Sequence, residues 1–141
     1  MEAHENYTQQ HQDIRVENGI AYGDVVEAVN FGYAKKLTAV NAINLAALAW
    51  APPAVKELSI GGVVEASARF KWSPLEDDNI AGYKLYWRDT TSPTWDHSRF
   101  VGNETEATLE GIVIDNFFFG IATVGKNGIE SPVVFPNKVM R

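Results

Sequence analysis

The residues of this chain that could do chemistry are few, and most lie near its N-terminus. The chain has three histidines and no cysteine, so thiol nucleophiles, disulfides and thiolate metal ligands are excluded. His4 and His11 lie in a polar N-terminal segment. An imidazole is a common metal ligand, but two histidines in such a segment are more often simply solvated.

No motif for a complete catalytic site can be found in the sequence. The chain lacks a Gly-x-Ser-x-Gly nucleophile elbow, a His-Glu-x-x-His pair and a phosphate-binding glycine loop. The acidic run at 76–78 could suggest calcium, but an acidic turn beside a proline is far more often a solvated loop. The scattered acids Glu17, Asp24 and Glu27 are expected on a loop that faces solvent. The residues themselves therefore predict no catalytic group.

Four side chains are candidates for binding a partner: Tyr86, Trp95, His97 and Phe100. Aromatic residues at strand or loop positions often mark contacts, because each buries a large area with little loss of entropy. Three interpretations stay open. These residues pack against another domain, bind a polypeptide or sugar surface, or complete an atypical core.

Composition limits the partners. The chain has 141 residues, 45% of them hydrophobic, so a packed core is expected. Its formal net charge of −6 argues against nucleic-acid binding, because there is no basic cluster to neutralise phosphates. The longest nearly apolar stretch, 45–55, is too short for a membrane span. The polar N-terminal residues do not resemble a signal peptide.

A predicted β-sandwich positions the four candidate binding residues. Alternation over 83–88 places Tyr83, Leu85 and Trp87 on one face of a strand, and Lys84, Tyr86 and Arg88 on the other. A second alternating run covers 66–72, and turn-forming residues at 73–79 join the two runs. Further strands are expected at 55–60, 106–109, 117–124 and 129–135, with a hairpin turn at 126–128. About seven short strands with regular turns predict a mainly β, seven-stranded sandwich.

One helix is expected before the sandwich, over residues 31–50, with Asn30 as its N-cap. Its apolar residues fall near helical spacing and predict a stripe along one side. Pro52 and Pro53 form a stiff link after the helix. We therefore place a domain boundary there, between residues 1–51 and 52–141.

Residues 53–138 resemble a fibronectin type III domain, which is immunoglobulin-like. Trp72 fits the family's second strand, AGYKLYWR its third, and FFFGIATVGKNGIESP its last hairpin. Phe117 departs from the pattern, because the family usually has a tyrosine there whose hydroxyl bonds to backbone. That missing hydrogen bond is worth about 1 kcal/mol.

The first half of the chain is similar to the C-terminal end of the catalytic domain in bacterial M28-family zinc aminopeptidases, which are metallopeptidases and hydrolases. The resemblance rests on ENYTQQHQDIRVENGIAYGD with the helix after it, and on TSPTWDHSRFVGNETEATLEGIVIDNFFFGIA in the second half. It implies that His11 is the last zinc ligand, with His4 as its rival, and that Asp13 orients the imidazole of His11. It also implies zinc in the parent enzyme, but none bound tightly by this chain alone.

The resemblance implies a C-terminal fragment of a secreted or periplasmic peptidase, with the sandwich as an accessory domain that contacts the catalytic domain or a polypeptide substrate. We expect no peptidase activity from the chain alone. The alternative is a stand-alone adhesion or binding module. Helix 31–50 needs a cover, and self-association through it is one option. Residues 1–30 are expected to be less ordered than the sandwich.

Overall fold

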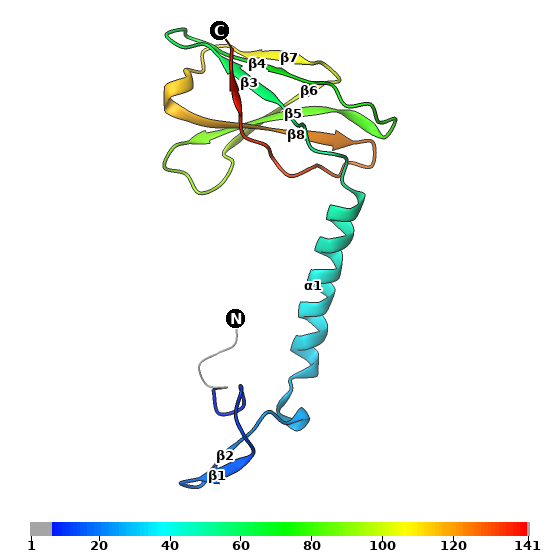
Figure 1. Cartoon of the computed structure of the whole chain (residues 1–141), viewed down its shortest axis with the longest axis vertical. Helices are drawn as coiled ribbons and strands as arrows, with labels where there is room; N and C mark the ends of the chain where they lie inside the picture. The colour runs from blue at the N-terminus through cyan, green and yellow to red at the C-terminus, as the bar shows by residue number, and fades with distance from the viewer. Residues whose placement is uncertain (1–6, 141) are drawn as a thin grey trace. The chain divides into compact units, whose positions relative to one another are not determined.

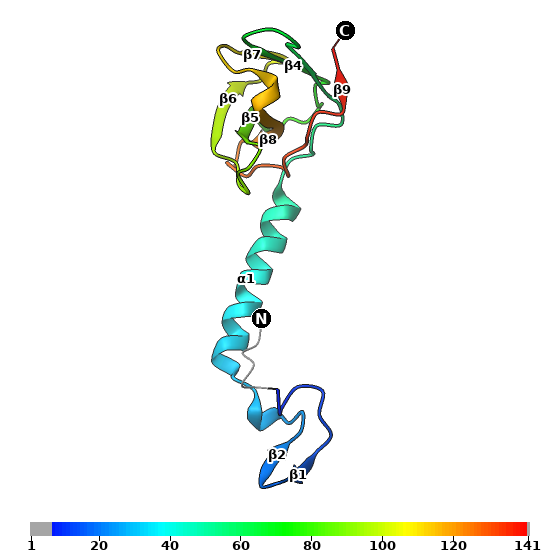
Figure 2. The same cartoon turned by 90° about the vertical axis from the view of Figure 1, so that its left-hand side faces the viewer.

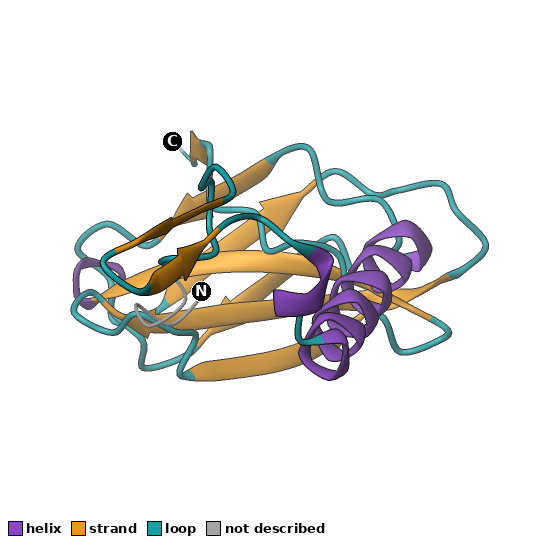
Figure 3. Cartoon of the chain, turned by 90° about the horizontal axis from the view of Figure 1, so that it is seen from below, coloured by secondary structure: helices purple, strands orange, loops and turns teal. Residues whose placement is uncertain are grey.

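The computed structural model describes residues 7–140, and the secondary structure of these residues is mainly β (Figure 3). They contain nine strands, one α-helix and two short 3-10 turns. The chain divides into two compact units, residues 1–45 and 46–141. The division falls inside the helix, a few residues before the boundary that the double proline predicts.

The first unit contains a small hairpin of β1 (Arg15–Glu17) and β2 (Ile20–Tyr22), which pair antiparallel. Asn18 and Gly19 form the turn between them with φ values of 51° and 79°, which confirms the turn that this dipeptide predicts. Gly23 follows with φ 143°, and a Cβ there would lie 3.0 Å from Ile14 Cγ1 and 3.2 Å from its Cα. Glycine is thus needed where the chain leaves the hairpin.

Helix α1 (Phe31–Trp50) has the bounds that the sequence predicts. Asn30 is its N-cap, because the Asn30 Oδ1 atom accepts a 2.9 Å hydrogen bond from the Tyr33 backbone N–H. The expected one-sided apolar stripe is wrong, since apolar residues surround the helix. No residue of α1 is buried; Ile43, for example, is 67% exposed.

The second unit is a sandwich of a four-stranded and a three-stranded sheet, and Figures 1 and 2 show the two layers. The first sheet has the order β7 (Glu106–Leu109), β4 (Ala68–Trp72), β3 (Leu58–Gly61) and β9 (Lys138–Val139). The second sheet has the order β6 (His97–Gly102), β5 (Ile80–Asp89) and β8 (Phe117–Gly125). All pairings are antiparallel except the parallel pair of β3 and β9.

The core lies between the two sheets, and its residues come from alternating strand positions. Tyr83 and Leu85 are buried, and Trp87 packs against the same core, as the period of two predicts. The ring of Tyr83 meets that of Trp72 edge-on with 5.4 Å between centroids. Its hydroxyl accepts a 3.0 Å hydrogen bond from the Leu75 N–H, which ties down the connection between β4 and β5.

The prediction of a strand over 129–135 is wrong, because this segment does not form a regular strand. Only isolated bridges, Ile121 to Val134 and Val124 to Glu130, join this segment to β8. Pro132 lies between them and has no N–H to give to a ladder. The chain then crosses to the other sheet, where β9 pairs with β3. The expected strand 55–60 likewise begins only at Leu58.

Candidate functional site

His11 lies on a loop that backbone contacts hold against the end of the hairpin. The backbone N–H of His11 donates to both carboxylate oxygens of Asp24, at 3.0 and 2.9 Å. Two backbone bonds reinforce the contact: Gly23 N–H donates to the Thr8 carbonyl, and Asp24 N–H to the Gln12 carbonyl, both at 3.1 Å. His11 has a positive φ of 52°, and its side chain is exposed. The loop therefore presents an imidazole to the surface from a fixed backbone.

The carboxylate that accepts from the His11 backbone N–H is that of Asp24 and not that of Asp13. Asp13 is exposed, and its backbone carbonyl accepts a 3.4 Å hydrogen bond from Arg15 Nη1. The proposed orientation of the imidazole by Asp13 stays a prediction, as does the role of His11. The rival ligand His4 lies outside the described residues.

A zinc site cannot be completed from the residues that the structure describes. Within 7–140 there is no group of three or more His, Cys, Asp or Glu side chains that could hold a metal ion. Protein zinc sites take at least three protein ligands. Of the other acids considered, Glu17 pairs with Arg15 at 3.3 Å, and Asp77 Oδ1 accepts from the Asn79 N–H at 2.8 Å to shape its turn. The described residues alone thus do not fit the ion, and at most His11 offers one ligand.

The second candidate region is the outer face of the three-stranded sheet, where two of the four predicted binding residues meet. Trp95, from the connection between β5 and β6, lies 5.9 Å from the Tyr86 ring and 5.4 Å from the Phe135 ring. The Arg88 guanidinium lies 5.6 Å from the Trp95 centroid and 4.8 Å from that of Phe118. We call these five residues the outer aromatic cluster.

Small residues on β8 make room for this cluster. Gly120 is paired with Tyr86, and a Cβ at Gly120 would lie 3.1 Å from Trp95 Cη2 and overlap Val133 Cγ1. Arg88 Nη1 also donates to the Ser92 carbonyl, so the connection is folded back onto the sheet. Trp95 is half-buried as a result, whereas Phe118 and Phe135 remain 44% and 48% exposed.

Two polar side chains, Glu130 and Lys84, border the cluster at Tyr86. Glu130 accepts a hydrogen bond from the Tyr86 hydroxyl and pairs with Lys84 Nζ at 3.0 Å. The hydrogen bond to Glu130 raises the pKa of Lys84, and the bond to Tyr86 adds to this effect. Burial raises the pKa of Tyr86, and its bond to Glu130 raises it further. Glu130 thereby fastens the segment after β8 to β5.

His97 and Phe100 lie elsewhere than Tyr86 and Trp95. His97 is exposed and stacks on Trp87, with 5.3 Å between ring centroids. Phe100 is 53% exposed and covers Gly82, where a Cβ would lie 2.8 Å from Phe100 Cζ. The four predicted residues therefore do not form one site.

Three members of the cluster were not among the predicted binding residues: Arg88, Phe118 and Phe135. Glu130 beside them was not predicted either. Alternation along 83–88 already placed Arg88 on the face of Tyr86 and could have included it. Nothing in the local sequence places Glu130 there, because it is 44 residues from Tyr86.

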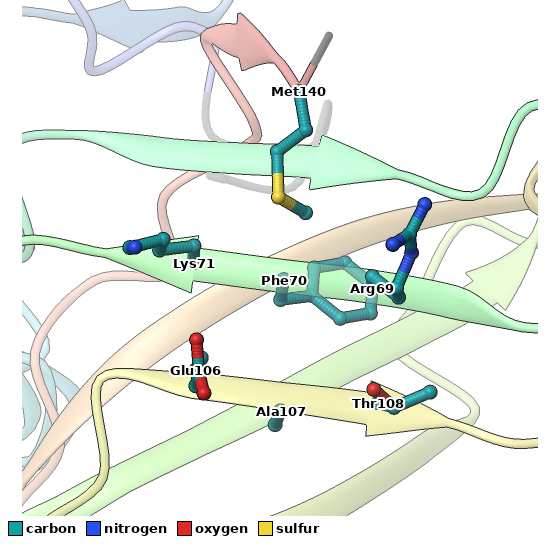
Figure 4. A pocket seen from close by; sticks show the side chains of 7 residues that line it. All are labelled: Arg69, Phe70, Lys71, Glu106, Ala107, Thr108 and Met140. Atoms are coloured by element: carbon teal, nitrogen blue, oxygen red, sulfur yellow. The ribbon is translucent and has the colours of Figure 1, made fainter.

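A shallow hollow lies on the four-stranded sheet (Figure 4). Arg69 and Lys71 of β4 and Glu106 and Thr108 of β7 line it, and Met140 reaches across β3 (Figure 4). Its volume is about 400 Å³. Arg69 is already paired with Glu65 at 2.7 Å, and no buried polar group points into the hollow among the lining residues. It therefore has little of the character of a ligand site.

Among the described residues, no helix has the length and apolar character needed to cross a bilayer.

No family model matches the chain. Over 96% of its length, the chain is similar to curated fungal proteins named "Probable zinc metalloprotease". Over 136 residues it is 39% identical to the protein of Pyrenophora tritici-repentis, and 38% identical to those of Pyrenophora teres f. teres and Leptosphaeria maculans. The chain spans 28%, 28% and 31% of their lengths, which is less than a third of each.

Two solved structures are also similar. A myokine structure matches with a TM-score of 0.44 at 15% identity, over 62% of this chain and 99% of the other. Titin module A71 from human cardiac muscle matches with a TM-score of 0.44 at 22% identity, over 59% of this chain and 84% of the module.

Proposed function

We propose that this chain is the C-terminal part of an exported zinc aminopeptidase of the M28 type, with a fibronectin type III-like accessory domain. The observation that carries the proposal is the identity of 38–39% over 96% of the chain to proteins named as zinc metalloproteases. The chain spans less than a third of these relatives. The zinc site and the general base accordingly belong to a larger protein, to which His11 contributes one ligand.

The exposed surface of α1 supports a partner of this kind. Within residues 7–50, Gly23 is the only buried residue that the structure describes, and large apolar side chains such as Phe31 and Leu45 are 65% and 68% exposed. An isolated helix is marginal in water without tertiary burial. In the proposed enzyme, the peptidase domain covers α1 and supplies that burial.

The sandwich has its own core and serves, in this proposal, as a packing or substrate-binding domain. Phe118 and Phe135 of the outer aromatic cluster provide the apolar contact area that such a role needs. The contacts of Arg88 with Phe118 and of Trp95 with Phe135 hold these rings in place before any partner binds. A preordered surface loses less entropy on binding.

The test compares the 141-residue chain with a longer gene product that carries it at its C-terminal end. Both are assayed with aminoacyl chromogenic substrates in the presence of zinc, and their bound zinc is measured. We expect turnover and stoichiometric zinc only in the longer protein, and a loss of both in its His11→Ala variant. The matched controls are His97→Ala, which should leave both unchanged, and His4→Ala, which tests the rival ligand. Robust turnover or tight zinc binding by the 141-residue chain would overturn the proposal.

The alternative function is a stand-alone binding module, favoured by the separate core of the sandwich and the exposed rings of Phe118 and Phe135. A glycan or peptide array probed with the chain distinguishes the two functions. Specific binding that Phe118→Ala abolishes, together with no longer gene product in the source organism, would favour the module.

A further inference from the structure

Two triplets of the form Asn-x-Thr occur in the chain: Asn6-Tyr7-Thr8 and Asn103-Glu104-Thr105. This triplet, with any residue but proline in the middle, is the acceptor sequence for N-linked glycosylation. No other asparagine of the chain has Ser or Thr two positions later. Asn6 lies outside the described residues, so the structural argument concerns Asn103.

Asn103 occupies the turn between β6 and β7, and its side chain is exposed. The preceding residue, Gly102, has a φ of 70°, and a Cβ built there would meet nothing within 4 Å. The turn is fixed by backbone contacts after the asparagine, since the Thr105 carbonyl accepts a 2.9 Å hydrogen bond from the Trp72 N–H. The space beside Asn103 is therefore open, and the turn does not depend on its side chain.

Two other asparagines near strand ends differ from Asn103, because their side chains make hydrogen bonds. The Asn137 amide bonds to the Leu58 N–H at 3.1 Å and to the Lys56 carbonyl at 2.9 Å. The Asn127 amide accepts from the Ile129 N–H at 3.0 Å within its hairpin turn. Neither residue belongs to an acceptor triplet. Asn103 belongs to one, and its amide has no hydrogen bond with any described residue, so a glycan there displaces no native contact.

We propose that Asn103 is an N-glycosylation site that the folded sandwich accommodates, which rests on the proposed export and on the fungal origin of the similar proteins. In the transfer step, the Asn103 amide nitrogen forms a bond to the anomeric carbon of a lipid-pyrophosphate-linked oligosaccharide. The bond from that carbon to the pyrophosphate oxygen breaks, the lipid pyrophosphate leaves, and the amide loses one proton.

The position of Asn103 also gives the glycan a physical role. Residue 103 connects β6 to β7, and each of these strands is the edge of its sheet. Exposed edge strands are prone to pair with other chains. A bulky, hydrated glycan between the two edges would hinder such pairing, so the glycosylated chain should aggregate less than the unglycosylated one.

The experiment is secretion of the full chain from yeast behind an added leader, so that acceptor function is separated from natural export. Peptide mapping after enzymatic deglycosylation in heavy-oxygen water marks each occupied asparagine as a labelled aspartate. We expect the label at residue 103, its loss in Asn103→Gln and its retention in Thr105→Ser, which preserves the triplet. Asn6→Gln, made in parallel, removes any glycan on the other triplet.

Peptide mapping of the unaltered secreted chain shows whether Asn103 is glycosylated even if a variant fails to fold. Secreted, folded chain with Asn103 unlabelled would overturn the proposal. Natural export is measured separately, by locating the protein in its source organism. An intracellular protein whose leader-directed form is labelled at Asn103 would overturn the proposed export while supporting the acceptor site.

Discussion

Substitution of Gly120 by alanine tests whether the outer aromatic cluster depends on close packing over β8. The added Cβ would overlap Val133 Cγ1 and lie 3.1 Å from Trp95 Cη2 and 3.2 Å from the Val134 carbonyl oxygen. These groups come from two separate segments, the connection between β5 and β6 and the segment after β8, and one of them is a backbone oxygen, so no single side-chain rotation relieves all three contacts. Gly120 has no positive φ, and backbone strain therefore does not contribute.

Inserting a methyl group into such a packed site costs about 1–3 kcal/mol. For a domain of the size of the sandwich, this corresponds to a fall in Tm of roughly 4–24 °C. Calorimetry of the full chain gives the Tm, and near-ultraviolet circular dichroism reports the loosened environment of Trp95. Both signals should change in Gly120→Ala.

Two further variants make this test specific. Gly61→Ala is the matched control, because the three atoms nearest to its Cβ all belong to the flexible Met140 side chain, with Cε at 3.1 Å and Cβ at 3.2 Å. We expect a cost below about 1 kcal/mol there. Val133→Ala combined with Gly120→Ala should recover part of the loss, since residues in contact are not additive. An unchanged Tm in Gly120→Ala, or strict additivity in the double variant, would refute the packing argument.

Two more predictions concern hydroxyl groups of the sandwich. Tyr83→Phe removes the acceptor of the Leu75 N–H and should lower the free energy of unfolding by about 1 kcal/mol in urea titrations, so that an unchanged midpoint would contradict the role of this bond. Because the pKa values of Lys84 and Tyr86 are raised, these two groups contribute fully to the free energy of unfolding at any pH below their pKa values in the unfolded chain, which are about 10. This contribution is lost as the pH rises through their pKa values in the folded chain. The stability advantage of the native chain over Glu130→Gln should therefore be constant from pH 7 to 9 and shrink toward pH 11; an advantage that grew with pH would be inconsistent with this coupling.

Local patterns in the sequence determined much of the fold. Helix α1 and its cap at Asn30 and the turn at Asn18 and Gly19 follow from contacts within a few residues, and the inward face of Tyr83 and Leu85 follows from the alternation along their strand. In such cases the side chain that sets the structure lies close in sequence to the backbone that it controls. The two-sheet sandwich follows because alternating strands need a second layer to cover their apolar faces.

The candidate sites were predicted less completely. The sequence placed Tyr86 and Trp95 among possible contact residues, and the structure brings these two together while His97 and Phe100 lie apart. The role of His11 and its partner Asp13 stays a prediction, because the ligands that would accompany an imidazole in a zinc site come from several separate segments.

Only the tertiary structure decided where the segment after β8 goes and what it holds. The crossing to β3 and the reach of Glu130 to Lys84 and Tyr86 depend on contacts between residues more than 40 positions apart. The contact between the Asp24 carboxylate and the His11 backbone spans 13 residues, which local periodicity and turn propensity also do not describe. Periodicity and turn propensity describe a residue's own neighbours, whereas such pairings exist only after distant strands have packed.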